Sequence, residues 1–438
     1  MIRVETSEEK NRALGLVQGM DRYIGLTLGR YGGFRVIDSL LAFSIVAFIL
    51  FISFLGHIFF RKTGWPDLLF LITVGIVVGP VLNIFSKNDF LSFLPLFSTF
   101  TLLMVLFRGG MELNILDVIG GSFRALFQAS AYFAAGMVGT AVFVHFVMGW
   151  HWIESFMLGS MVSQTGAVVI VPLAKKIGVR SESATLLSIE ATMTSIFNII
   201  FFHAFLETRL GGILNLVEAL TLMVLKFSVG ITVGAIVGIL WLWTLFHIPM
   251  DELMYMVAVG IILMGYIISE RLGGSGSLTV LTLGIIIGND KEILRMIGSS
   301  QSPGIFLEVK KYLERVQAEI SHILRTFFFV LLGIMFDVKQ LSLFTILSYE
   351  LPIICILLAI RYLVTSVSTW KTTMFRDRCA ITGLCALGLT PALLSLIPMQ
   401  YNLSNSQFYS IIVTNLIILT NVITSISALK FRRGLVKG

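Results

Sequence analysis

The chain has 438 residues, of which 56% are hydrophobic and only 13% are charged, and its formal net charge is +7. A soluble domain carries about 25% charged residues, so this composition and the mean hydropathy of +0.91 exclude an ordinary soluble protein. The composition predicts an all-α polytopic membrane protein, because helices are one of the few structures that satisfy the backbone inside a bilayer.

Residues 1–37 are predicted to be a polar lead, with a surface helix over Glu8–Gln18. We expect no secretory signal, because Met1–Lys10 holds three glutamates and no apolar run precedes Leu40. Residues 38–431 are predicted to be a single transmembrane domain, and 432–438 a short C-terminal tail. Most of its apolar spans reach the ~20 residues that cross the hydrocarbon core. About 13 are predicted, at 38–60, 65–85, 93–113, 122–148, 153–174, 183–206, 217–246, 252–269, 275–289, 320–337, 349–369, 379–397 and 408–431.

The longest connection, 290–319, has the pattern of an amphipathic cytoplasmic helix. Basic residues gather in the loops that follow odd-numbered spans, and this distribution argues against nucleic acid as a partner. By the positive-inside rule the C-terminus is cytoplasmic, and 13 spans then put the N-terminus outside. The six basic residues of the N-terminal lead oppose this orientation.

The fifth span is interrupted by Ser163-Gln164-Thr165-Gly166, and seven spans later Gly388-Leu389-Thr390-Pro391 interrupts the twelfth. A separation of seven spans makes the two segments run in opposite directions. A matched pair of interrupted spans in inverted repeats marks the substrate site of many secondary transporters. The alternative is that these residues are ordinary glycine and proline in membrane helices.

Glu190 is the lone acid inside the sixth span, where an ionisable side chain costs roughly 3 kcal/mol or more. On a helix it shares a face with Thr194, and Ser195 is adjacent. The carboxylate and neutral oxygens there suit a dehydrated monovalent cation or a proton. A structural glutamate paired with a buried base is the alternative.

Arg108 is the predicted base for such a pair, because arginine stays charged when buried and binds a carboxylate through two nitrogens. A side chain that snorkels to the interface would explain the same position. We find no phosphate loop, no nucleophile beside a histidine and no metal cluster in the sequence. It therefore predicts no enzyme, no cofactor and no metal beyond a transported alkali cation.

Four stretches lie in an order and spacing typical of one family: Gly64–Pro80, Leu106–Leu113, Gly276–Asn289 and Phe327–Asp337. By these stretches the chain resembles the monovalent cation:proton antiporter superfamily, the sodium/proton exchangers and their potassium-exporting relatives. The resemblance implies a sodium/proton antiporter-like fold with two crossing interrupted helices. It also implies a homodimer in a lipid bilayer, with a prokaryotic plasma membrane as the expected location.

The chain departs from the family pattern at the residues that bind the ion. The family's Glu-Ser-Leu-Leu-Asn-Asp aligns with Glu190–Ser195, so that Thr194 and Ser195 replace asparagine and aspartate. Thr165-Gly166-Ala167 stands where sodium exchangers have Thr-Asp-Pro, and Thr390-Pro391 replaces a late Arg-Gly. The glutamate's usual arginine partner is therefore expected to be missing.

Three functions remain open from the sequence. The first is exchange of Na⁺ or K⁺ for protons by alternating access, with Glu190 as the titrating group and neutral oxygens from Ser163, Thr165, Thr194, Ser195 and Thr390. The second is a degenerate antiporter fold that senses or scaffolds without exchange. The third is a carrier of another solute, such as an anion held by Arg108.

Overall fold

The computed structural model describes residues 39–63, 65–85, 90, 93–113, 123–211, 216–247, 254–296, 304–336, 345–403 and 405–437. All the regular structure in these ranges is helical. Eight of the described helices are long and apolar enough to cross a membrane. Residues 49–438 form one compact unit, and the surface helix predicted over Glu8–Gln18 lies outside the described residues.

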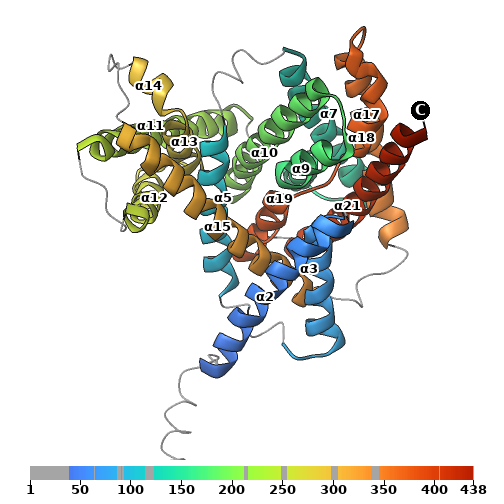
Figure 1. The fold of residues 1–438 in the computed structure, drawn as a ribbon, viewed down its shortest axis with the longest axis horizontal. Helices are drawn as coiled ribbons and strands as arrows, with labels where there is room; N and C mark the ends of the chain where they lie inside the picture. The colour runs from blue at the N-terminus through green and yellow to red at the C-terminus, as the bar shows by residue number, and fades with distance from the viewer. Residues whose placement is uncertain are drawn as a thin grey trace, which may run out of the picture. The chain divides into compact units, whose positions relative to one another are not determined.

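The helices follow one another along the chain, from blue to dark red in Figure 1. The first half contains α2 (Ser39–Thr63), α3 (Asp67–Ile76), η1 (Val77–Val81), α5 (Leu94–Glu112), α7 (Phe123–Met148), α8 (Trp152–Val162), α9 (Ala167–Ile177) and α10 (Ser181–Leu210). The second half contains α11 (Leu216–His247), α12 (Met254–Arg271), α13 (Gly276–Gly288), α14 (Asp290–Met296), α15 (Gly304–Ile334), η3 (Ile346–Glu350), α17 (Leu351–Ser368), η4 (Thr373–Asp377), α18 (Arg378–Gly383), α19 (Leu389–Leu394), α20 (Ile397–Gln400) and α21 (Ser406–Lys437).

Each predicted span overlaps one described helix or several consecutive helices. The number of membrane crossings stays a prediction, since four apolar segments, among them α13, are shorter than 18 residues. The connection predicted at 290–319 is not a separate helix over its whole length. Its second part belongs to α15, which runs without interruption from Gly304 into the tenth span because no proline and no inner glycine precede Gly333.

Two helix pairs, α5 with α13 and α3 with α15, pack especially closely. Glycines allow this approach: a Cβ on Gly284 or Gly110 would collide with the backbone of the facing helix. The same holds for Gly75 and Gly333 in the second pair. The first pair joins spans three and nine, and the second joins spans ten and two. Seven spans separate three from ten and nine from two, so each helix of the first pair corresponds to one helix of the second. Inverted repeats are expected to give such matched pairs.

Both predicted interruptions occur, and they cross each other. The first separates α8 from α9 at 163–166, as the sequence predicts. The second lies at 384–388, so that Thr390 and Pro391 belong to the first turn of α19 rather than to the break. Pro391 does not break the helix, because a proline is tolerated in a first turn, where its missing N–H has no intrahelical acceptor.

The crossing point is a contact between two glycines. The backbone N–H of Gly166 donates to the carbonyl of Ala386 across 2.7 Å. A Cβ on Gly166 would lie 2.8 Å from the Cα of Gly388, closer than real Cβ atoms approach. Helices α9 and α19 both begin at these glycines, so two helix N-termini with positive partial charge face the crossing.

Candidate functional site

The crossing is accompanied by a buried ion pair between the two halves of the chain. Glu190, from the first half of α10, and Arg361, from the middle of α17, are both fully buried. The Nη1 of Arg361 pairs with Oε1 of the carboxylate, and Nη2 donates to Oε2 at 3.3 Å. This is the two-nitrogen geometry in which arginine binds a carboxylate most strongly.

The remaining donors of Arg361 bind the end of α18 and the second break. Its Nε donates to the carbonyl of Ile381 and its Nη2 to that of Leu384, both at 3.1 Å. The guanidinium also lies 4.9 Å from the ring centre of Tyr132 on α7. A cation here complements the negative end of α18. Arg361 therefore joins the second interrupted helix to the acid of α10.

A layer of polar side chains completes the surroundings of the carboxylate. Gln128 of α7 lies 3.4 Å from Oε2, and the hydroxyl of Thr165 lies 3.5 Å from Oε1. Gln128 is held in turn by α17, because its Nε2 donates to Thr365 and its Oε1 accepts from Ser368 at 2.6 Å. These contacts fix the glutamate from two helices, α7 and α17, and from the first break.

The neutral oxygens predicted from the sequence fall into two groups. Thr165 and Thr194 lie beside Glu190: the hydroxyl of Thr194 donates to the carbonyl of Glu190 and accepts from the N–H of Thr165 at 3.3 Å. The buried hydroxyl of Ser163 has no partner among the described residues. Ser195 is half-buried and donates back to the carbonyl of Ala191 at 2.8 Å. Thr390 is buried in the first turn of α19.

The predicted pair between Arg108 and Glu190 is wrong. Arg108 pairs with Glu112 of its own helix at 2.7 Å, and its side chain is 33% exposed. Its Nη1 also lies 3.4 Å from the carbonyl of Ala318. Two residues four apart on a helix meet on the same face, and this local pair keeps Arg108 away from the crossing.

The expectation that the glutamate has lost its arginine partner is also wrong, because Glu190 is paired with Arg361. Arg361, which the sequence motifs did not indicate, supplies the partner from the span before the second break. The signal was present, because Arg361 and Glu350 are the only charged residues in the predicted span 349–369. An arginine deep in an apolar span needs a partner as much as Glu190 does.

Helix α21 supports the second break. The backbone N–H groups of Leu387 and Cys385 donate to the hydroxyls of Thr420 and Thr424, and the amide of Asn421 donates to the carbonyl of Leu387. An interrupted helix at membrane depth has backbone groups that need such partners. The break is therefore held open by side chains one turn apart on a single helix.

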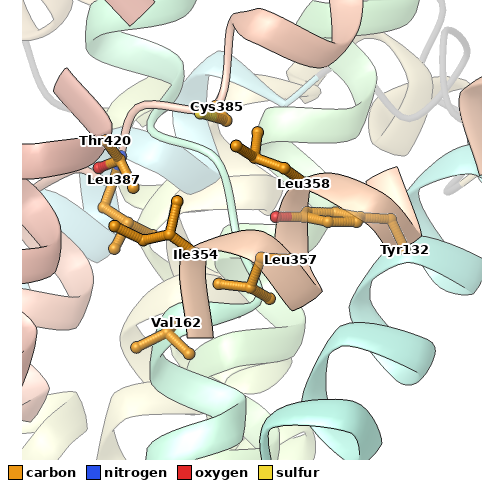
Figure 2. Close-up of a pocket in the computed structure, with 8 residues that line it drawn as sticks. All are labelled: Tyr132, Val162, Ile354, Leu357, Leu358, Cys385, Leu387 and Thr420. Atoms are coloured by element: carbon orange, nitrogen blue, oxygen red, sulfur yellow. The ribbon is translucent and has the colours of Figure 1, made fainter. Parts of the chain in front are cut away.

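A small cavity of about 10 Å³ lies beside the crossing. Figure 2 shows Tyr132 entering it from α7, with Cys385 and Leu387 of the second break on another side. Its walls are Tyr132, Val162, Ile354, Leu357, Leu358, Cys385, Leu387 and Thr420. This volume is about the least that holds one water molecule, so a hydrated cation would not fit there.

The arrangement places carboxylate and hydroxyl oxygens together, but the carboxylate is already paired. Glu190 offers carboxylate oxygens, and Thr165 and Thr194 offer neutral ones, but Arg361 already occupies the carboxylate. The guanidinium contacts both carboxylate oxygens, so a cation or a proton must compete with it for them. No cluster of metal-binding side chains is found in the described part of the chain.

A family model described as sodium/hydrogen exchanger, transmembrane, matches residues 45–430. Among curated proteins, the chain is 25% identical over 391 residues to the K(+)/H(+) antiporter NhaP2 of Shewanella oneidensis, covering 85% of this chain and 63% of that protein. It is 22% identical over 385 residues to the K(+)/H(+) antiporter NhaP of Alkalimonas amylolytica, covering 83% and 62%. The chain thus spans less than two thirds of the length of these relatives.

Among solved structures, the sodium proton antiporter MjNhaP1 from Methanocaldococcus jannaschii has a similar fold. The TM-score is 0.69, and the match covers 90% of this chain and 97% of that one. Because the sequence identity is only 16%, the similarity supports the fold and not the substrate.

Proposed function

Because the chain belongs to the sodium/hydrogen exchanger family, we propose that it exchanges Na⁺ or K⁺ for protons across a membrane by alternating access. The relatives named above are potassium/proton and sodium/proton antiporters, and the family model covers nearly the whole described chain. These similarities favour exchange over a sensor, a scaffold or an anion carrier.

One observation carries the proposal: the oxygens of Glu190 lie against the break in the first of two crossing interrupted helices. Thr165, in that break, is 3.5 Å from the carboxylate, and Gly166 bonds to the second break. A cation that sheds its water here meets carboxylate and hydroxyl oxygens and no competing bulk solvent. This is the place where secondary transporters of such construction bind their ions.

Proton and cation share one carboxylate in the proposed cycle. A proton on Glu190 removes its charge and releases Arg361, which keeps its bonds to the carbonyls of Ile381 and Leu384. A cation binds when the proton leaves and the guanidinium moves aside, with Thr165, Thr194, Ser163, Ser195 and Thr390 as the neutral ligands. Arg361 is a positioning residue, because it acts through Glu190.

The wider assembly is part of the same proposal. Spans five, six, eleven and twelve, which contain α8, α9, α10, α17, α18 and α19, move against the remaining helices. The protein is a homodimer in a prokaryotic plasma membrane, with its N-terminus outside and its C-terminus in the cytoplasm. Large apolar side chains exposed on α11 and α12, such as Trp243 and Met256, suit contact with lipid.

The test is transport by the full chain in proteoliposomes that contain a pH-sensitive dye. Addition of Na⁺ or K⁺ should release protons, and Glu190→Gln should reduce the rate at least 100-fold because an amide cannot exchange a proton. Glu112→Gln is the matched control, since this acid pairs with Arg108 away from the crossing, and its rate should stay within twofold of wild type.

Equal rates for wild type and Glu190→Gln would contradict the assignment of the proton to Glu190. If no alkali cation gives a response in either protein, cation/proton exchange itself is refuted. Ser195→Asp restores the family's acid, so a gain of exchange in that variant alone would show that the fold is intact and the carrier group is lost.

A further inference from the structure

Glu350 is a second buried acid, at a distance from the crossing. It ends the π-helical turn η3 that leads into α17, and only 1% of it is exposed. π-Helical turns are rare and occur often at functional positions. Its partner is Asn415 of α21, which is 3% exposed and whose Nδ2 donates to Oε1 of Glu350 at 2.6 Å.

Two buried oxygens of this pair have no hydrogen-bond partner among the described residues. They are Oε2 of Glu350 and Oδ1 of Asn415. Both accept hydrogen bonds and neither donates while the carboxyl group is ionised. A proton on Oε2 would turn that oxygen into a donor, and the unpartnered Oδ1 belongs to the same amide whose Nδ2 already donates to Oε1.

Among the described residues, no cationic side chain of η3, α17 or α21 is placed to pair with the ionised form. Among the described elements, α17 and α21 make the main contacts with η3. The nearest charge on α17 is Arg361, eleven residues or about 16 Å along the helix, and it is bound to Glu190. On α21 the first described charge is Lys430, about 22 Å beyond Asn415.

The other titratable groups on these elements are uncharged in their ordinary form. They are Tyr349, Cys355, Tyr362 and Tyr409. The hydroxyl of Tyr409 donates to the carbonyl of Glu154 and is not directed to Glu350. A buried acid without a compensating charge favours its neutral form, and here the neutral form also makes Oε2 a donor.

The pair is mechanically connected to the crossing. Asn415 precedes Thr420 and Asn421 by five and six residues on α21, which is about 8 Å along the helix. Those two side chains hold the backbone of Leu387 in the second break. A change in the charge of Glu350 therefore acts on the helix that supports the break.

We propose that Glu350 is a second proton-binding site of this transporter, protonated in the described conformation and paired with Asn415 as an acid with an amide. When α17 and α21 shift, the proton passes from Oε2 to a water molecule, and the carboxylate keeps its bond from Nδ2. The role in transport rests on the proposed cation/proton exchange, whereas the bound proton does not. Glu350 gives the chain a second side chain that carries a proton, in addition to Glu190, whereas the hydroxyl of Ser195 cannot do so.

Infrared spectroscopy of the purified full chain tests the bound proton directly. At neutral pH the wild-type spectrum should contain the carbonyl band of a protonated carboxylic acid, and this band should weaken as pH rises. Glu350→Gln should remove it while preserving the fold, because glutamine, like the protonated acid, has one acceptor oxygen and one donor group. Glu154→Gln is the control, since that buried acid pairs with Arg209 and should leave the band unchanged.

The second measurement is cation-driven proton release in proteoliposomes, which Glu350→Gln should slow at least tenfold. A band of undiminished intensity in Glu350→Gln, or one that no pH change affects, overturns the proposal. So does a normal transport rate in that variant after the band is lost. A band that appears only when alkali cations are withdrawn would assign the site to a cation instead. If the wild type does not transport, the pH dependence of the band decides alone.

Discussion

Glu190 and Arg361 are two buried charges that offset each other's free-energy cost of burial. Each would be strongly unfavourable alone at this depth, and together they satisfy one another and two carbonyls at the second break. Buried pairs of this kind contribute little net stability compared with an apolar core. Removing one partner, however, leaves the other charge unpaired.

We therefore expect Arg361→Ala to destabilise the protein by about 3–5 kcal/mol. Arg108→Ala is the matched control, because its pair with Glu112 is partly exposed and contributes about 0–1 kcal/mol. Thermal unfolding of both variants in detergent measures the difference. The double variant Arg361→Met with Glu190→Gln should recover part of the loss, and equal effects of Arg361→Ala and Arg108→Ala would contradict the pairing.

The sequence predicts Glu190 as a site residue but not its partner, and the reason is physical. A lone acid in an apolar span is visible because burial is costly wherever the partner lies. The partner is 171 residues away and is brought close by the packing of α10 and α17 on the same helix, α7. The local sequence pattern cannot reveal such a contact. It suggested Arg108 instead, whose side chain pairs with Glu112 on its own helix.

At the scale of elements, the two crossing breaks depend on glycine at 166 and 388. The backbones touch there, and one N–H of the first break is bonded to the second. Hydropathy and breaker residues were enough to predict both interruptions, because an apolar run containing glycine and polar residues cannot stay helical easily. The second break lies a few residues before the predicted one, since the proline begins the helix that follows it.

Gly166→Ala should disrupt the crossing, because its Cβ would lie 2.8 Å from the Cα of Gly388. We expect a loss of stability of about 1–3 kcal/mol, as for other overpacked sites, with at least a tenfold loss of cation/proton exchange. Gly109→Ala is the control: apart from the adjoining residues and the backbone of its own helix, no atom lies within 4 Å of its Cβ, and alanine suits the interior of α5 better than glycine. Normal exchange and unchanged unfolding in Gly166→Ala would show that the crossing adapts.

At the scale of the whole molecule, the order of spans and their overlap with the helices follow from hydropathy. Lipid permits few alternatives to helices of membrane length, so composition alone predicts most of the fold. The pairing of α5 with α13 and of α3 with α15 is a different matter. It uses glycines such as Gly284 and Gly333, whose role is clear only when the facing backbone is known.

The cancelled charge of Glu190 and Arg361 also bears on how the proposed exchange responds to electrical potential. A site with one uncompensated charge that moves through the membrane field gains or loses up to about 2.3 kcal/mol per 100 mV. A neutral pair carries no net charge through that field. We therefore expect movement of the site with neither proton nor cation bound to change less than twofold under an imposed voltage of either sign, whereas a proton on Glu190 leaves Arg361 uncompensated and makes the step that carries it voltage-dependent. Glu190→Gln leaves Arg361 uncompensated, so any return step that survives in this variant should become voltage-dependent.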